Sequence, residues 1–314
     1  MAELYGVSQD SVYRRMRGEK VMTLEEILLL YDTYDFSLEE VLSSSKARLV
    51  FSFQPISENG FDFIDYLEYI NTMLERIAAC DHKMLYYLAN DVPLFQMLNT
   101  PAIASFNLFF WQKTILGFDQ YKDKKFKLGI KDDRVNRISR EIQDAYFRIP
   151  TVEIYSQQTI DTTLRQIEFY LKSGLFEFME TALVLCDEFL KLIRHIKSQG
   201  EHGRKFRLSD TETALMDVDY QVFFNEVLYS DTTILVESDG DKMTYMTNNG
   251  LNVLRTDSVE YYDHSMNSFN ILQRKSIGVS GGNDRERDRI FRIFEQQILR
   301  FKDKLALEIQ AERM

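Results

Sequence analysis

The 314-residue chain has few of the residues that interrupt or crosslink a fold. It contains 4 prolines, 13 glycines and 2 cysteines. Cys80 and Cys186 lie far apart and follow no metal-ligand spacing, so we expect neither a disulfide framework nor a zinc site. The scarcity of proline and glycine favours long helices over many short strands and turns. The composition therefore predicts a mainly α fold.

The sequence also has no long apolar run. No stretch approaches the roughly 20 apolar residues that cross a bilayer, and no basic segment followed by an apolar run opens the chain. The formal net charge of −11 disfavours attraction of the whole surface to nucleic acid or to an anionic membrane. These absences predict a cytoplasmic protein that does not bind membranes.

Motifs of catalysis and cofactor binding are missing as well. The histidines His82, His195, His202 and His264 are scattered and form no hydrolase pattern. The sequence has no P-loop, no dinucleotide-binding G-x-G-x-x-G and no EF-hand loop. We therefore expect no catalytic residue, no cofactor and no metal, and an enzyme with a novel site is the least favoured function.

What the chain does have is an uneven distribution of charge. Its first 20 residues hold four basic side chains against three acids, a net charge of +1, so the remainder carries −12. A basic segment joined to an acidic body is typical of a DNA-contacting module on a sensor or assembly domain.

The residue pattern of the basic segment predicts two helices joined by a turn. Residues 2–5 end one helix, Gly6 supplies the positive φ that a tight turn requires, and Ser8 caps a second helix over residues 9–17. Val12 and Met16 are four residues apart and are expected to face the interior. The polar side chains that remain outside can read base edges and hold phosphates. The predicted DNA-binding residues are Ser8, Gln9, Ser11, Tyr13, Arg14, Arg15, Arg17 and Lys20.

The stretch AELYGVSQDSVYRRMRGEK resembles the helix-turn-helix of the Cro-like and phage-repressor family. The residues on that family's characteristic spacing are Ala2, Gly6, Val7, Ser8 and Val12. The next stretch, residues 23–42, looks like the family's two closing helices, which begin after the cap residues Thr23 and Ser37.

This resemblance covers about the first 42 residues and implies roles for the polar side chains. It implies that Gln9, Ser11, Tyr13 and Arg14 contact base edges. It places Arg15, Arg17 and Lys20 on phosphates. An amphipathic hairpin with a solvated basic face and no DNA contact is the alternative.

The segment departs from the family pattern at its start. Family modules have a further helix and most of another before the alanine, where this chain has only Met1. Either the sequence is truncated, which we favour, or the module is degraded and cannot fold as an independent DNA-binder. We predict an incomplete DNA-binding domain over residues 1–45 and an effector and dimerisation domain over residues 46–314.

The larger domain is predicted as a helical bundle similar in architecture to tetratricopeptide repeats, without a clean internal repeat. Helices are expected over residues 60–80, 83–88, 132–147, 258–275 and 284–312, and two more follow Pro150 with a break near Gly174. Short antiparallel strands are expected between residues 222 and 247, around the hairpin signal Asp239-Gly240. Phe106, Phe109 and Phe110 share a helical face and are expected in the core.

The larger domain contains, in this order, the stretches DVPLF, FFW, SGLFE and KSIGVSGGNDRERDRIF. This order is similar to that of helix-turn-helix regulators of Bacteroidetes-type bacteria with an uncharacterised helical C-terminal region. The leading hypothesis is a sequence-specific transcriptional regulator. Its expected partners are double-stranded DNA, a second copy of the chain, and a peptide or small molecule as effector. The alternative is a helical protein-interaction scaffold that does not bind DNA.

Overall fold

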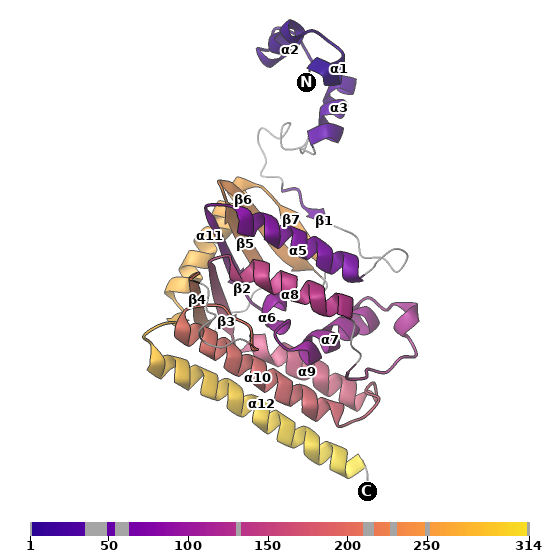
Figure 1. The fold of residues 1–314 in the computed structure, drawn as a ribbon, viewed down its shortest axis with the longest axis vertical. Coiled ribbons are helices and arrows are strands. Elements are labelled where there is room, and N and C mark those ends of the chain that lie inside the picture. Colours follow the sequence, from indigo (N-terminus) through magenta and orange to yellow (C-terminus); the bar gives the residue numbers. More distant parts are fainter. Residues whose placement is uncertain are drawn as a thin grey trace. The chain divides into compact units, whose positions relative to one another are not determined.

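The computed structural model describes residues 2–34, 49–53, 63–129, 133–209, 217–226, 231–248 and 252–312. The chain forms two compact units, Met1–Phe51 and Ser52–Met314, which we describe separately (Figure 1). The predicted boundary after residue 45 lies outside the described residues. The first strand, β1 (Ser52–Phe53), already pairs with the sheet of the larger unit.

The small unit contains the predicted helix, turn and helix. Its helices are α1 (Ala2–Tyr5), α2 (Gln9–Met16) and α3 (Leu24–Tyr34). Gly6 adopts φ +61°, and the Ser8 hydroxyl accepts the backbone N–H of Ser11 at 3.3 Å. The local prediction for residues 2–17 and for the helix after Thr23 is therefore confirmed. The second closing helix, predicted after Ser37, lies outside the described residues.

The larger unit is built on a mixed sheet of eight strands in the order β1-β7-β6-β5-β2-β3-β4-β8. Three central strands are parallel: β2 (Lys83–Leu88), β3 (Thr151–Ser156) and β4 (Tyr220–Asn225). The others pair antiparallel: β5 (Thr233–Ser238), β6 (Asp241–Asn248), β7 (Asn252–Thr256), β8 (Ile277–Gly278) and β1. The predicted mainly α fold with a small hairpin is therefore wrong.

The error has a physical cause in β2 and β3. The predicted helix over residues 83–88 is the strand β2, and β3 was not predicted at all. All six residues of β3 are buried. A strand covered on both faces loses the alternation of apolar and polar residues, so the six residues of β2 resemble a piece of buried helix. In β3, the buried polar residues Thr151, Glu153 and Ser156 also interrupt the apolar pattern.

The predicted helical bundle similar to tetratricopeptide repeats is also wrong, because the helices cover the faces of the eight-stranded sheet. Most other individual elements lie near their predicted positions. Strands β4, β5 and β6 lie near the expected positions, and the turn at Asp239 and Gly240 has positive φ at both residues. The helices are α5 (Phe63–Ala79), α6 (Leu94–Met97), α7 (Pro101–Phe110), η1 (Trp111–Ile115), η2 (Asp119–Tyr121), α8 (Asp133–Phe147), α9 (Gln158–Lys172), α10 (Thr181–His202), α11 (Val259–Arg274) and α12 (Asp284–Glu312).

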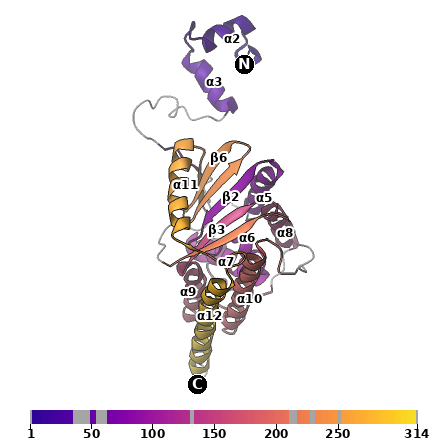
Figure 2. The same ribbon diagram turned by 90° about the vertical axis from the view of Figure 1, so that its left-hand side faces the viewer.

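The sheet separates two cores of unequal size. Leu85 and Tyr87 of β2 belong to the large core, to which α5, α6, α7, α8, α9, α10 and α12 contribute. Tyr86, on the opposite face of β2, packs against Phe269 of α11 in a smaller core. Figure 2 shows α11 alone on one side of the sheet and α5 and α8 on the other.

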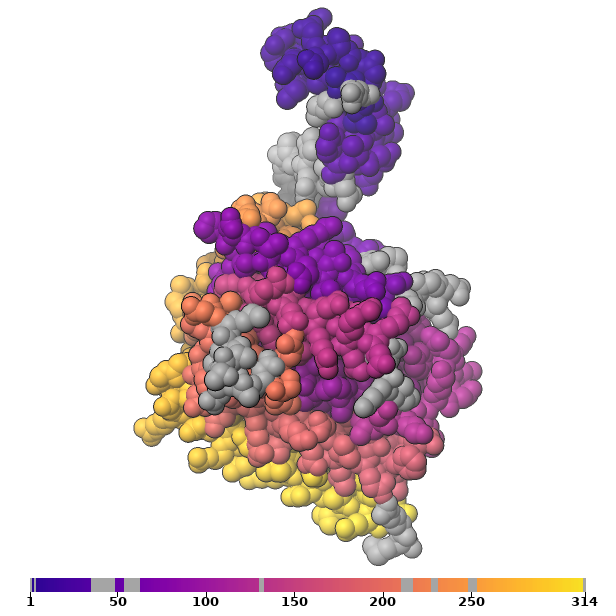
Figure 3. Space-filling view, viewed as in Figure 1, coloured from indigo at the N-terminus to yellow at the C-terminus, as the bar shows by residue number. Residues whose placement is uncertain are grey.

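Aromatic side chains fill the large core, as predicted. Phe106 is fully buried and makes ring contacts with Phe126, Tyr170 and Phe176. Helix α12 packs along α10, and their side chains lie side by side on the surface in Figure 3. None of the helices in the described ranges is both long and apolar enough to cross a membrane.

Replacing a β2 side chain that points into the large core tests this arrangement. Leu85 is 1% exposed, so Leu85→Ala should lower the free energy of unfolding of the larger unit by about 2–5 kcal/mol because it leaves a cavity. The matched control Leu307→Ala, at a side chain that is 68% exposed, should change it by less than about 0.5 kcal/mol. Equal losses in urea-induced unfolding would contradict the assignment of β2.

Candidate nucleic-acid interface

The outward side of α2 presents a row of polar side chains. Gln9, Tyr13 and Arg17 follow one another at intervals of four residues and are exposed, and Arg14 lies beside them. Tyr13 is 59% exposed. Lys20 is also exposed beyond the end of the helix. These five predicted DNA-binding residues are exposed on α2 or just beyond its end, and Ser8, which caps the helix, is exposed as well.

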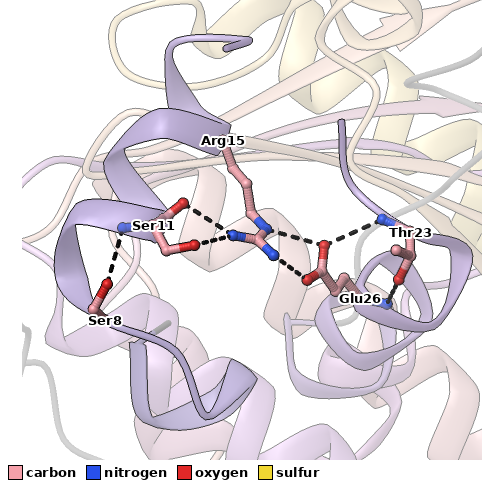
Figure 4. Close-up of polar contacts among 5 residues, drawn as sticks. All are labelled: Ser8, Ser11, Arg15, Thr23 and Glu26. Carbon is pink, nitrogen blue, oxygen red and sulfur yellow. Dashed lines mark hydrogen bonds and ion pairs between the residues drawn. The ribbon is translucent and has the colours of Figure 1, made fainter. Parts of the chain in front are cut away.

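The inward side of α2 is held by a charged residue. Arg15 is only 9% exposed and lies on the same side as the buried Val12. Its Nε donates to Oε2 of Glu26 in α3 at 3.0 Å, and its Nη2 pairs with Oε1 of the same carboxylate. Its Nη1 donates to the backbone oxygen of Ser11 at 3.0 Å and to the Ser11 hydroxyl at 2.6 Å (Figure 4).

The carboxylate of Glu26 has a second set of partners. The backbone N–H of Thr23 donates to Glu26 Oε2 at 3.1 Å, and the backbone N–H of Glu26 donates to the Thr23 hydroxyl at 3.3 Å. This reciprocal pair is a capping box at the start of α3. One carboxylate therefore connects the start of α3 to the inward side of α2.

These hydrogen bonds also shift two pKa values. The guanidinium of Arg15 and then the backbone N–H of Thr23 lower the pKa of the Glu26 carboxyl. The hydrogen bond to Glu26 raises the pKa of Arg15. Both shifts favour the charged forms, so the pair stays ionised around neutral pH.

The structure divides the predicted DNA-binding residues into two groups. Ser8, Ser11 and Arg15 make the contacts that cap α2 or hold it on α3. The other group is exposed on α2 or beyond its end and consists of Gln9, Tyr13, Arg14, Arg17 and Lys20. The predictions that Ser11 reads a base and that Arg15 binds a phosphate remain predictions, and the observed contacts of both residues are structural. The spacing contained this signal, because Arg15 follows Val12 by three residues and therefore shares its face.

Two of the outward arginines share an acidic neighbour. Glu19 Oε1 lies 2.8 Å from Arg17 Nε, and Glu19 Oε2 lies 3.6 Å from Arg14 Nε. All three side chains are about half exposed to solvent, where such ion pairs contribute roughly 0–1 kcal/mol. The ion pairs of Arg14 and Arg17 with Glu19 are therefore weak.

Part of the small unit's surface is apolar. Met16, expected to face the interior, is 69% exposed, so that prediction is wrong. Val21, Leu24 and Leu28 are also exposed. Leu24 and Leu28 lie four residues apart on α3 and therefore on one side of it.

The larger unit contains a buried acidic cluster that sequence reasoning missed. Glu153 of β3 is fully buried, and the hydroxyls of Tyr146, Tyr155 and Tyr220 all donate to its carboxylate. The last two donor-to-acceptor distances are 2.5 Å. Gln96 donates in turn to the Tyr220 hydroxyl at 3.1 Å. These residues come from α6, α8, β3 and β4, so the cluster joins the parallel strands to two helices.

A buried lysine lies beside this cluster. Lys205 Nζ donates to the backbone oxygens of Tyr146 and Ile149 at 2.6 and 2.5 Å and to the Thr151 hydroxyl at 2.6 Å. It also lies 3.7 Å from the centre of the Tyr146 ring. Burial lowers the pKa of Lys205, and the charge of Glu153 opposes that shift. All three N–H donors of Lys205 are used within the protein. Lys205 therefore binds backbone oxygens at and just beyond the end of α8 and has no donor left for a ligand.

An open cavity of about 300 Å³ lies along the outer edge of β4. Arg204 is the basic residue in its lining, and its guanidinium already pairs with Asp217 and Asp219 at 2.7 and 2.8 Å. In the described parts of the chain, no three acidic, histidine or cysteine side chains are grouped so that they could hold a metal ion. The cavity alone therefore does not identify a ligand.

The chain matches no family model, no curated protein and no solved structure.

The carboxylate of Glu26 makes the small unit sensitive to acid. Because its pKa is lowered in the folded unit, its contribution is present above the ordinary glutamate pKa of about 4.3 and is lost as pH falls through the lowered value. Glu26→Gln should therefore speed hydrogen exchange of α2 backbone amides at neutral pH, and the difference should disappear in acid. The control Glu25→Gln, at the exposed neighbour, should have no such effect; similar exchange in the two variants would contradict this role.

The buried tyrosines should resist ionisation. Burial, followed by the charge of Glu153, raises the pKa of Tyr146, Tyr155 and Tyr220 well above the ordinary value. Their contribution to stability is therefore complete below about pH 10 and is lost as pH rises further. In an alkaline absorbance titration, these tyrosines should ionise only when the larger unit unfolds, and Tyr155→Phe should reduce the absorbance change of that step. If Tyr155→Phe instead reduced the absorbance change that precedes unfolding, Tyr155 would be accessible to solvent in the folded unit, and this prediction would be wrong.

Proposed function

We propose that the small unit binds the major groove of duplex DNA through the outward side of α2, and that the protein is a sequence-specific transcriptional regulator. One observation carries this proposal: Arg15 fixes the inward side of α2 on α3, and the opposite side presents Gln9, Tyr13, Arg14 and Arg17 to solvent. These side chains supply the amide, hydroxyl and guanidinium groups that contact bases and phosphates.

The dimensions and chemistry of α2 support the proposal. An α-helix with its side chains is about 10–12 Å across, close to the width of the major groove, and the 8 residues of α2 form about two turns. The Gln9 amide can form two hydrogen bonds with adenine, and the Arg14 guanidinium can form two with guanine. Arg17 and Lys20 lie at and beyond the end of the helix, where phosphate contacts are the natural role for flexible cations.

The proposal gives the larger unit the role of effector and dimerisation domain. Two copies would place their α2 helices about 34 Å apart on successive major grooves, so a signal that changes the dimer would change affinity. The proposed effector is a small molecule or peptide, and the cavity beside β4, near the lower limit of small-molecule sites, does not by itself identify it. A regulator of bacterial genes would act in the cytoplasm.

A second candidate function is protein binding without DNA contact. The exposed apolar side chains Met16, Val21, Leu24 and Leu28 favour it, because a small unit that acts alone in water would be expected to bury more of them. The two functions differ in their dependence on the arginines of α2, which a protein contact through the apolar side chains does not require.

Loss of the outward arginines should weaken DNA binding in a salt-dependent way. In titrations of labelled duplex from the chain's own promoter region, Arg14→Ala and Arg17→Ala should each lower affinity by roughly fivefold to tenfold at low salt. Arg17→Ala, which removes a phosphate contact, should also reduce the slope of log affinity against log salt by about 0.9, whereas Arg14→Ala, which removes a base contact, should mainly reduce the preference for the promoter sequence. The control Arg165→Ala removes an exposed arginine of α9 and should leave all three quantities unchanged. Wild-type affinity and slope in the α2 variants would favour the protein-binding function.

A further inference from the structure

We propose that Glu19 is an internal competitor for phosphate that lowers the affinity of the protein for DNA. This inference rests on the proposed function of α2. It assigns a regulatory role to a residue that stands outside the predicted DNA-binding set and carries the charge opposite to that of its neighbours.

The end of α2 holds Glu19 next to the arginines. Gly18 has φ +72°, a left-handed conformation that favours glycine and reverses the chain after the helix. The backbone N–H of Gly18 donates to Arg15 O, and that of Glu19 donates to Arg14 O, both at 2.9 Å. These bonds direct the chain back over the last turn of α2, so the position of Glu19 is set by the backbone.

The carboxylate of Glu19 contacts both arginines as a phosphate would. Arg17 uses two nitrogens: its Nε donates to Oε1 at 2.8 Å, and its Nη2 donates to Oε2 at 3.4 Å. Arg14 Nε lies 3.6 Å from Oε2. A carboxylate and a phosphate both offer guanidinium a pair of anionic oxygens. The two ligands therefore compete for the same donors.

The exposure of these groups makes the competition reversible. The side chains of Arg14, Arg17 and Glu19 are 54%, 58% and 47% exposed, so water screens their attraction. A DNA phosphate can replace Glu19 at small cost. The displaced carboxylate then lies close to the DNA backbone, where its negative charge opposes binding. Both effects weaken binding to any sequence, and both diminish as salt increases.

The test compares two substitutions that each remove one negative charge from the small unit. Glu19→Gln keeps the size of the side chain and its backbone hydrogen bond but removes the competing charge. Glu25→Gln removes an exposed charge from the first turn of α3. Binding of the full chain is measured by fluorescence anisotropy with a labelled mixed-sequence duplex of about 20 base pairs, two helical turns, across a salt series.

We expect Glu19→Gln to bind the duplex about fivefold more tightly than wild type at low salt, with a gain that shrinks as salt rises. Glu25→Gln should change affinity by less than about twofold. Equal gains in both variants, or no gain in Glu19→Gln while wild type binds, would overturn this inference and leave the proposed function standing. If no protein binds the duplex at any salt concentration, the proposed function fails and this inference fails with it.

Discussion

The ion pair between Arg15 and Glu26 determines which side of α2 faces outward. Arg15 uses its guanidinium nitrogens on Glu26 and Ser11, and Glu26 also closes the capping box with Thr23. A buried cation is costly unless its donors are satisfied, so α2 cannot rotate about its axis without breaking these contacts. The polar row on the opposite side is therefore presented in a fixed orientation, which base reading requires.

In the larger unit, charged side chains are also buried together with hydrogen-bond partners, and they are buried more deeply than Arg15. Burial of Glu153 is tolerated because three tyrosine hydroxyls donate hydrogen bonds to its carboxylate. Burial of Lys205 is tolerated because three oxygens accept hydrogen bonds from its amino group. A fully satisfied buried network restricts how the strands and helices can pack, because any slip leaves a polar group without a partner. In both units, buried charge specifies geometry, and the exposed charges of α2 are the ones that we propose contact DNA.

The sequence predicts helices correctly where an apolar repeat is long or where a cap residue identifies the start of the helix. Apolar residues repeat every three or four positions over several turns of α5 and α12, and Ser8 and Thr23 cap the starts of α2 and α3. Prediction from the sequence failed for β2 and β3, whose six residues each are too short to show a period when both faces are covered. It also missed Glu153, because its tyrosine partners meet only after the parallel strands form. The predicted DNA-binding set includes Arg15 with the outer arginines, although its spacing from Val12 places it inward.

The most direct test of the central claim is to follow the arginine Nε–H signals by nuclear magnetic resonance during a titration with duplex DNA, after assignment by substitution. We expect the signals of Arg14 and Arg17 to move as DNA is added, whereas the signal of Arg15 should keep its position and its slow exchange with water. An Arg15 signal that moves with the other two would show that the Arg15–Glu26 pair opens on binding. Signals that all stay in place would contradict the assignment of α2 as the DNA-binding helix.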